Sequence, residues 1–410
     1  MFLLRTILII PIMSTALWAG QVQVGSDYHF ITVSEGLEAS LSGDTVLVHP
    51  GTYVESGLII SHTLTLLGID NPIIDGNHSG EILTVTADDV RIKGFTFKGS
   101  GLSHLEENAA VRFEETRGGR VSDNTFEDNF FAVYISKSEK CIIENNRISG
   151  LAKTESRSGN GIHLWYCKDI TIEENYIEGH RDGIYLEFVE QCVVTQNHST
   201  KNLRYGLHFM FSNHNEYNNN QFDKNGAGVA VMYSRHVDMH NNVFADNWGS
   251  SAYGLLLKDI YDSNITDNQF NRNTVGLYSE ACNRIHVEGN NFEQNGWAVK
   301  IMANSMDNVF THNNFLANTF DIATNSRQNF NAFNQNYWNR YRGFDLDKDG
   351  IGDVPFRPVK LFSLLTEKNE PTLMLMRSIF VEIMDLAESY IPILTPATLI
   401  DAEPLMRINP

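Results

Sequence analysis

Short alternations of apolar and polar residues recur along most of the chain and are separated by polar turns. The stretches GIHLWY, GIYLEF, GLHFMF and GVAVMY are typical, and each precedes a polar turn, a second short segment and a turn that contains asparagine. Alternation with a period of two predicts half-buried β-strands, and the polar residues between them predict turns. We therefore expect a chain made of many very short strands.

These units return at a nearly fixed spacing. From residue 108 onward, a signature of the form N-x-(F/I)-x-x-N repeats, with successive gaps of 22, 29, 22, 23, 22, 26, 22, 23 and 23 residues. Its first asparagines are Asn124, Asn146, Asn175, Asn197, Asn220, Asn242, Asn268, Asn290, Asn313 and Asn336. A period in the twenties indicates a solenoid, and the leucine and helix pattern of leucine-rich repeats is missing here.

The predicted fold class is all-β: a right-handed parallel β-helix over residues 20–340, with coils of about 22 residues. Each coil would hold three short strands, and stacked asparagines would hydrogen-bond from coil to coil. The amphipathic stretch FITVSEGLEASL is expected to cap the open N-terminal end. The insertions LAKTESR (151–157) and DNWGSSAY lengthen two coils, and such insertions map to loops on one face, often a binding face.

The N-terminus predicts export. Residues 1–19 combine one arginine, an apolar run and a small residue at Ala19, which is the pattern of a cleaved secretory signal. In an oxidising compartment cysteines often pair, but Cys141 and Cys192 share a column two coils apart, roughly 10 Å. A disulfide needs Cα atoms within about 7 Å. We therefore expect the four cysteines, Cys167 and Cys282 included, to be buried free thiols.

The charge balance limits the partners. A formal net charge of −19 argues against nucleic acid, because phosphate binding needs clustered cations. The same charge disfavours anionic lipid surfaces and is a weak indication of cation binding.

Sliding GVAVMY back by 22 residues superimposes two pairs of potential metal ligands. Met232 falls on Met210, and His236 falls on His214. Neighbouring strands lie about 4.8 Å apart, so each pair should be adjacent on the outer surface. The offset therefore predicts an outward patch of soft ligands.

The same alternation predicts whether the neighbouring side chains point into the core or outward. Phe211 and Tyr233 are expected to point inward, and His208 is expected to point outward beside Met210. Met239, which lies on the next strand of the coil that contains Met232, is a further candidate ligand. The candidate copper ligands are thus Met210, Met232, His208, His214, His236 and Met239.

Thioether and imidazole ligands together favour copper, and Cu(I) in particular. All nine methionines of the mature chain lie at or after Met210. The alternative is that methionines fill gaps in the core while histidines occupy turns without any metal.

An Asp-rich loop follows the last coil. DLDKDGIGD places Asp345, Asp347, Asp349 and Asp353 near Gly350, which resembles the opening of a calcium loop. The glutamate expected at the twelfth position is replaced by Phe356. A calcium site is therefore one interpretation, and an Asp-Gly turn without metal is the other.

A helix is predicted after this loop. Pro371 suits its first turn and Pro392 its end. One face is broadly apolar, while Glu382, Asp385 and Glu388 disfavour a membrane span. The helix is expected to cap the solenoid or to dock on an apolar partner.

These segments carry a family resemblance. NYWNRYRGFDLDKDGIGDVPFRPVKLF, the helix after it and LTPATLIDAEPLM resemble the C-terminal signature of the NosD family, and GLHFMFSN, AGVAVMYS and GLLLKD resemble its central coils. The family is the periplasmic component of the NosDFY copper-linked ABC transporter, which is required for maturation of nitrous oxide reductase in denitrification. The resemblance covers essentially the mature chain, and the C-terminal signature is its most specific part.

The resemblance implies a non-catalytic metallochaperone of the periplasm, docked on the inner-membrane transporter. It would take copper from the lipoprotein chaperone NosL and deliver it to the apo-reductase NosZ, while standing on the membrane subunits NosY with their ATPase NosF. The C-terminal module, residues 341–410, would be the dock. Its apolar docking residues would be Met374, Met376, Ile379, Phe380 and Ile383.

Two other classes of function stay open at this point. Parallel β-helices often carry polysaccharide lyases, hydrolases or epimerases, which need a groove with a paired acid and base. The candidates for such a groove are His180, Arg181, Asp182, Tyr185 and Glu187. A carbohydrate-binding solenoid is the third class, and its outer aromatic residues would be Trp165, Tyr185 and Trp248.

Overall fold

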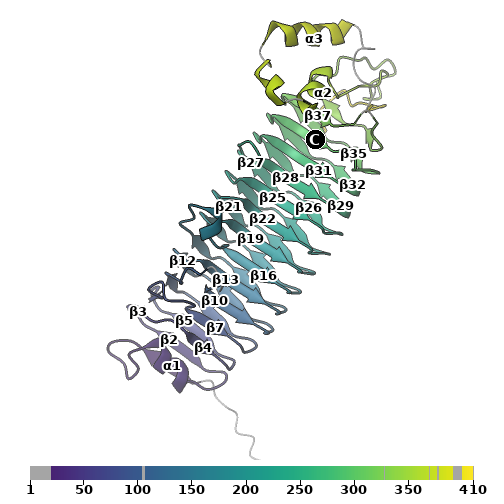
Figure 1. The fold of residues 1–410 in the computed structure, drawn as a ribbon. Helices are drawn as coiled ribbons and strands as arrows, with labels where there is room; N and C mark the ends of the chain where they lie inside the picture. The colour runs from purple at the N-terminus through teal and green to yellow at the C-terminus, as the bar shows by residue number, and fades with distance from the viewer. Residues whose placement is uncertain are drawn as a thin grey trace, which may run out of the picture.

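The computed structural model describes residues 20–103, 107–326, 328–368, 370–375, 378–390 and 399–409. The predicted signal segment, residues 1–19, lies outside the described residues. The rest winds into a long parallel β-helix whose coils stack along one axis (Figure 1). The predicted fold class is therefore confirmed.

Within the described residues, the coils contribute their strands to three parallel sheets of 14, 12 and 13 strands. The 14-stranded sheet contains β1 (Gln21–Val24), β2 (Thr45–Val48), β5 (Thr65–Gly68), β8 (Arg91–Lys93), β11 (Arg120–Ser122), β14 (Ile142–Glu144), β17 (Thr171–Glu173), β20 (Val193–Thr195), β23 (Glu216–Asn218), β26 (Asp238–His240), β29 (Tyr261–Thr266), β32 (Asn283–Glu288), β35 (Val309–Thr311) and β38 (Ala332–Asn334). The 12-stranded sheet contains β4 (Leu58–Ile60), β7 (Leu83–Val85), β10 (Ala109–Glu114), β13 (Phe131–Ser136), β16 (Ile162–Trp165), β19 (Asp182–Glu187), β22 (Tyr205–Met210), β25 (Ala227–Met232), β28 (Tyr253–Lys258), β31 (Val275–Glu280), β34 (Trp297–Ile301) and β37 (Phe320–Thr324). The 13-stranded sheet contains β3 (Thr52–Val54), β6 (Ile73–Asp75), β9 (Thr96–Lys98), β12 (Thr125–Glu127), β15 (Arg147–Ser149), β18 (Tyr176–Glu178), β21 (His198–Thr200), β24 (Gln221–Asp223), β27 (Val243–Ala245), β30 (Gln269–Asn271), β33 (Asn291–Glu293), β36 (Asn314–Leu316) and β39 (Tyr337–Trp338).

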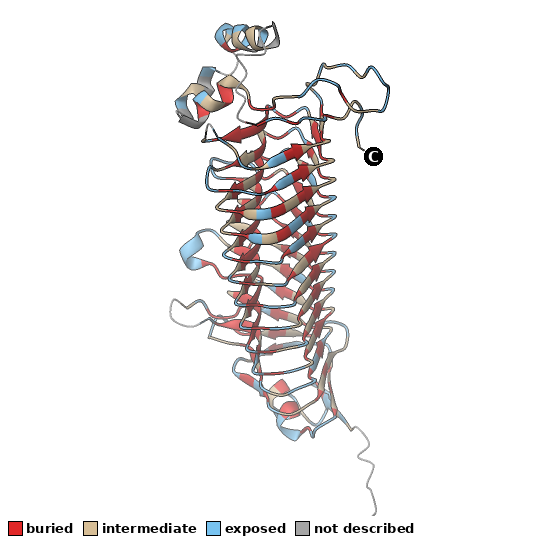
Figure 2. Ribbon diagram, turned by 90° about the vertical axis from the view of Figure 1, so that its right-hand side faces the viewer, coloured by how far each residue is buried: buried red, intermediate tan, exposed pale blue. Residues whose placement is uncertain are grey.

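The core is a column of apolar side chains inside the coils. Figure 2 shows the buried residues running along the whole interior, while the turns at the corners are exposed. One face of each short strand supplies this column, so adjacent coils bury each other's apolar residues. Phe244, Phe270 and Phe292 illustrate the packing, since their rings stack at centroid distances of 4.7 and 4.6 Å.

The repeated asparagines form a ladder, as the sequence predicts. The side-chain oxygen of each one accepts a hydrogen bond of 2.9–3.0 Å from the backbone amide of the asparagine one coil earlier, from Asn124 to Asn336. A second ladder links Asn202 to Asn318 in the same way. These bonds satisfy turn amides that the coil itself leaves unpaired.

A short helix covers the N-terminal end. Helix α1 (Val33–Ala39) begins after Thr32, whose hydroxyl accepts from the Glu35 amide while the Glu35 carboxylate accepts from the Thr32 amide. This is a capping box. Val33 and Leu37 are buried in the solenoid core, so the predicted N-terminal cap is confirmed.

The C-terminal module differs from the single predicted helix between Pro371 and Pro392. It contains α2 (Leu361–Lys368), the 3₁₀ helix η2 (Glu370–Leu375) and α3 (Ile379–Tyr390). Phe362 of α2 packs against Phe320 of β37, and Val381 of α3 belongs to the same buried cluster. Helix α2 thus rests on the last coil of the 12-stranded sheet, and α3 contacts α2. None of the described helices is long and apolar enough to cross a membrane.

Candidate functional site

Met210 and Met232 are neighbours in the 12-stranded sheet, as the 22-residue offset predicts. They are register partners at the ends of β22 and β25, and both side chains are partly exposed on the outer face. In the same column Glu187 precedes Met210, and Lys258 follows Met232. The two thioethers are therefore placed side by side between a carboxylate and an ammonium group.

His214 and His236 are also neighbours. Their rings stack at a centroid distance of 4.7 Å with an interplanar angle of 19°, and both side chains are exposed. Each residue adopts a left-handed backbone conformation, with φ of 56° and 54°, in the turn after its strand. The predicted pairing of the two histidines is confirmed.

Aromatic rings separate the methionine pair from the histidine pair. Phe211 and Tyr233 were expected inside, and this prediction is wrong: each strand ends one residue earlier, and φ values of 52° and 54° turn these side chains outward. With Tyr166 and Phe188 they form an exposed stack, which we call the aromatic ladder. Its centroid distances are 4.6, 5.3 and 5.1 Å in chain order.

His208 lies on the outer side of β22 but is not exposed. Its relative exposure is 5%, because Tyr185 and Tyr205 cover the ring at centroid distances of 4.8 and 4.7 Å. Burial lowers its pKa, while Asp182 acts in the opposite direction. Nε2 has no hydrogen-bond partner, whereas Nδ1 faces the carboxylate of Asp182 at 3.6 Å. The expectation of an exposed His208 is wrong, and of its two ring nitrogens only Nε2 is without a partner.

A buried ion pair that the sequence analysis missed holds this region together. Arg204 Nε donates to Asp182 at 2.8 Å, and the guanidinium lies 5.0 Å from the ring centroid of Tyr205. Burial opposes ionisation of Asp182, but the hydrogen bonds from Arg204 and His208 outweigh it and its pKa is lowered. Asp182 and Arg204 are 22 residues apart, which is one coil, so their spacing could have predicted that they lie side by side.

Met239 does not belong to the outer patch. It is the middle residue of the three-residue strand β26, its register partners are Tyr217 and Ile265, and it is fully buried in the core. The structure therefore corrects the expectation that Met239 contributes to an outward site. Four of the six candidates, the two methionines and the stacked histidines, remain on one accessible corner of two adjacent coils.

The Asp-rich loop gathers three of its four carboxylates. One oxygen each of Asp345, Asp347 and Asp349 lies within 4.8 Å of the others. The Asp353 carboxylate instead accepts from the Leu346 amide at 2.7 Å. The charge of Asp349 raises the pKa of Asp347, so the cluster concentrates negative charge and suits a hard cation.

Four of the five proposed docking residues lie in the described parts of the C-terminal helices η2 and α3. Ile379, Phe380 and Ile383 of α3 are exposed, as a dock requires. Met374 lies in η2, and Met376 lies outside the described residues. The exposed part of the predicted dock is thus the apolar face of α3.

The rival groove of acids and bases does not form as expected. Asp182 and His180 are buried, and Asp182 is bound by Arg204 rather than open to a polymer. Glu187 is partly exposed, and burial raises its pKa. Among the aromatic candidates, Trp248 is exposed while Trp165 and Tyr185 are half-buried.

Comparison with solved structures identifies the architecture. The fold is similar to the catalytic unit of an α-1,3-glucanase from Streptomyces thermodiastaticus (TM-score 0.61, 15% identity, covering 73% of this chain and 63% of that one). It is also similar to a family 28 exopolygalacturonase from Yersinia enterocolitica (TM-score 0.55, 10% identity, 77% and 78%). At such identities the likeness shows the fold alone.

Sequence comparison gives a narrower result. Two proteins, each described as a probable ABC transporter binding protein NosD, are 27% identical to this chain over 384 residues (Pseudomonas aeruginosa) and 359 residues (Stutzerimonas stutzeri). The first match covers 82% of both chains, and the second covers 82% of this chain and 81% of the relative. A family model described as "Periplasmic copper-binding protein (NosD)" matches residues 37–155 and 148–343.

Proposed function

The chain belongs to the NosD family of periplasmic copper-binding proteins, and on that premise we propose that it relays Cu(I) from a donor protein to apo-nitrous oxide reductase. In this proposal it acts as the periplasmic partner of an ABC transporter and carries out no catalysis. The donor is the lipoprotein chaperone NosL, and the acceptor is NosZ. Copper is the cargo of the protein and not a resident cofactor.

The observation that carries this proposal is the register pairing of Met210 with Met232. Two thioethers on adjacent strands form a soft ligand pair, which selects Cu(I) over the hard cations of the periplasm. Because the two side chains are partly exposed, they can bind Cu(I) without enclosing it. A partner protein can then add ligands to the ion or replace these two. A fully enclosed site would hold the ion too tightly for a relay.

The surroundings of the pair suit transfer between proteins. The aromatic ladder runs beside the methionines and offers an apolar strip that excludes water when a partner binds. The stacked His214 and His236 lie beyond the strip and supply further nitrogen ligands on the same two coils. His208 has one unpaired nitrogen, Nε2, beneath the surface. An arriving ion thus finds thioether and imidazole ligands on the same two coils.

The transporter is proposed to bind at the C-terminal end of the solenoid. The exposed residues Ile379, Phe380 and Ile383 of α3 form an apolar face suited to the membrane subunits NosY, whose ATPase is NosF. Glu382 on the same helix keeps it soluble at a membrane surface. This arrangement leaves the methionine pair on the solenoid free for the donor and the acceptor.

Delivery itself is tested by reconstitution. The mature protein is loaded with one equivalent of Cu(I) and freed of excess metal. It is then mixed with apo-reductase in the presence of a copper chelator that captures any free ion. We expect copper to appear in the reductase with the wild type, and to be lost to the chelator when Met210→Leu and Met232→Leu are combined. Equal delivery by the double variant would contradict the assignment of the relay to this pair.

A further inference from the structure

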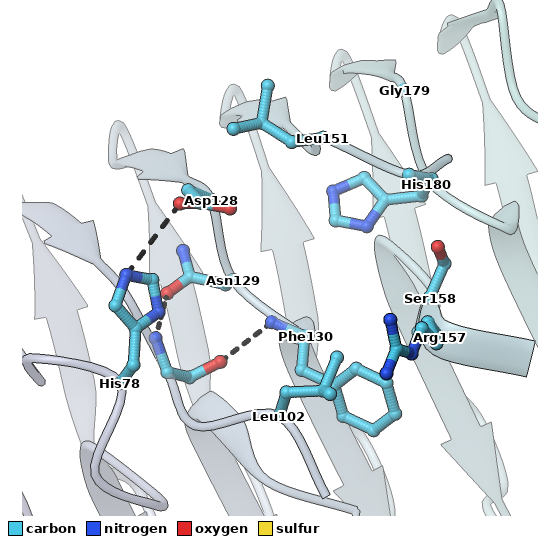
Figure 3. A pocket seen from close by; sticks show the side chains of 13 residues that line it. His78, Leu102, Asp128, Asn129, Phe130, Leu151, Arg157, Ser158, Gly179 and His180 are labelled. Atoms are coloured by element: carbon cyan, nitrogen blue, oxygen red, sulfur yellow. Dashed lines mark hydrogen bonds and ion pairs between the residues drawn. The ribbon is translucent and has the colours of Figure 1, made fainter. Parts of the chain in front are cut away.

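The insertion at residues 151–157 borders a cavity at the turns that lead into the strands of the 12-stranded sheet, whereas the methionine pair lies where strands of that sheet end. The 3₁₀ helix η1 (Glu155–Arg157) forms part of its wall, and the cavity has a volume of about 120 Å³ (Figure 3). A wider open cleft of about 790 Å³ adjoins it, and Phe130 and Ser158 line both. The inserted residues therefore build walls for a continuous hollow.

His180 supplies an unused hydrogen-bond acceptor at this cavity. Figure 3 shows its ring reaching between Leu151 and Ser158 toward Asp128 and Asn129. The backbone carbonyl of Gly159 accepts a hydrogen bond from the ring, whereas Nε2 has no partner. The side chain is 2% exposed, and burial lowers its pKa to about 4, so the ring is neutral at neutral pH. A neutral Nε2 accepts a hydrogen bond and donates none.

Two arginines line the hollow without a carboxylate of their own. Arg157 borders the cavity and Arg181 borders the cleft. Arg181 donates to the side-chain oxygen of Asn160 at 3.2 Å, and within the described residues neither guanidinium pairs with an acidic group. In contrast, Arg112 in the same cleft is bound by Glu81 at 2.7 and 2.9 Å. The hollow thus has two uncommitted cationic groups in a strongly acidic protein.

The remaining lining is mixed. Leu102, Leu151 and the ring of Phe130 give the cavity apolar walls, which suit C–H faces. Glu107 and Asn108 in the cleft are acceptors for hydroxyl groups. A ligand that fits must combine a carboxylate for the arginines, a hydroxyl for His180 and an apolar face for Phe130.

We propose that this hollow binds an acidic saccharide, with one uronate unit held between Arg157, Arg181 and His180. The carboxylate accepts from the two guanidinium groups, a ring hydroxyl donates to Nε2 of His180, and the carbon face rests on Phe130. In this proposal the site binds without cleaving. Of the carboxylates that line the hollow, Glu81 is bound by Arg112 and Asp128 lies 3.8 Å from His78. The ligand would tether the solenoid to an acidic polymer while the copper patch stays free.

The test uses the full mature protein and isothermal titration with α-1,4-linked tri-galacturonate. We expect saturable binding that weakens at least tenfold in Arg181→Gln and in Arg157→Gln. Arg235→Gln, an exposed arginine next to the aromatic ladder, is the matched control and should bind as the wild type does. Circular dichroism and thermal unfolding show whether each variant keeps its fold.

Two further probes separate saccharide recognition from simple charge attraction. The neutral galactotriose of the same linkage should bind at least tenfold more weakly, and citrate should not compete at equal concentration. Displacement by citrate at equal concentration would reduce the hollow to a general anion site and overturn the proposal. Equal binding of the neutral trisaccharide, unchanged binding in both arginine variants or the absence of any binding at millimolar tri-galacturonate would overturn it as well.

Discussion

The carboxylate of Asp401 sits at the end of the asparagine ladder and takes the place of the next asparagine. Its Oδ2 accepts hydrogen bonds from the backbone amide and the side-chain amide of Asn336, each at 3.1 Å, although the two residues are 65 positions apart. The indole Nε1–H of Trp338 donates to the same oxygen at 2.9 Å. A segment from the far C-terminus thus closes the last coil.

Replacing Asp401 tests this closure. Asp401→Ala leaves the backbone amide of Asn336 and the indole N–H of Trp338 without an acceptor, whereas the Asn336 side-chain amide keeps two backbone carbonyls. We therefore expect a loss of about 3 kcal/mol of unfolding free energy. Asp401→Asn keeps an acceptor oxygen in the same column and should lose only about 1 kcal/mol. Urea unfolding and limited proteolysis at the C-terminus measure both effects. Equal stability of the alanine variant and the wild type would show that the tail does not close the solenoid.

Tyr217 offers a change in the opposite direction. Its hydroxyl is buried inside the core without a hydrogen-bond partner, next to Phe209 and Phe222. Tyr217→Phe removes that unpaired group and keeps the ring, so we expect a gain of about 1 kcal/mol in unfolding free energy. Tyr217→Ala, which also removes the ring, should lose about 3–5 kcal/mol. A clear loss of stability in the phenylalanine variant would contradict the reading of the hydroxyl as unpaired.

Stability should also fall in acid because of buried imidazoles. Burial lowers the pKa of His163 to about 3 and that of His180 to about 4, whereas unfolded histidine titrates near 6.5. Below pH 6.5 the unfolded chain therefore binds protons that the folded chain refuses, and stability decreases as the pH falls through this window. Asp321, whose pKa burial raises to about 6, acts in the opposite sense, so a variant comparison is needed.

The comparison uses His163→Gln and the exposed control His29→Gln. Between pH 7 and pH 5, the His163 variant should lose about 2 kcal/mol less unfolding free energy than the wild type. The His29 variant should follow the wild type. Parallel curves for wild type and the His163 variant would show that His163 does not stay neutral in the folded protein.

The fold could be predicted from the sequence because its signal is repeated in every coil. The asparagine column and the period of 22 or 23 residues fix the strand register, and register alone places Met210 beside Met232. The alternation of apolar and polar residues gave the wrong side-chain direction where it was extended past the end of a strand. Phe211 and Tyr233 were expected inside, but the turn begins one residue earlier and its left-handed backbone reverses the side chain.

The rest of the site depends on contacts that spacing alone does not give. His208 follows the alternation of its strand, but Tyr185 and Tyr205 from neighbouring positions cover it. Met239 was misassigned although a signal existed, since its column contains Tyr217 and Ile265 and is apolar throughout. The cap at Asp401 was not found, because one aspartate without a periodic partner carries no signal in the sequence.

The Asp-rich loop gives a metal-dependent prediction. Calcium added to the metal-free protein should raise its melting temperature and protect the C-terminal module from proteolysis, because three carboxylates converge there. Asp347→Asn removes one charged ligand and should abolish most of the shift, whereas Asp353→Asn should reduce it less. No shift with millimolar calcium would favour the Asp-Gly turn without metal.

The most direct test of the copper relay is a competition titration of the purified mature protein with Cu(I) against a chromophoric chelator. Met210→Leu/Met232→Leu removes both thioethers while keeping apolar side chains, and Met239→Leu in the core is the matched control. We expect the wild type and the Met239 variant to compete equally, and the double variant to compete at least tenfold more weakly. Equal competition by all three proteins, or none by the wild type, would contradict the claim that this methionine pair holds copper.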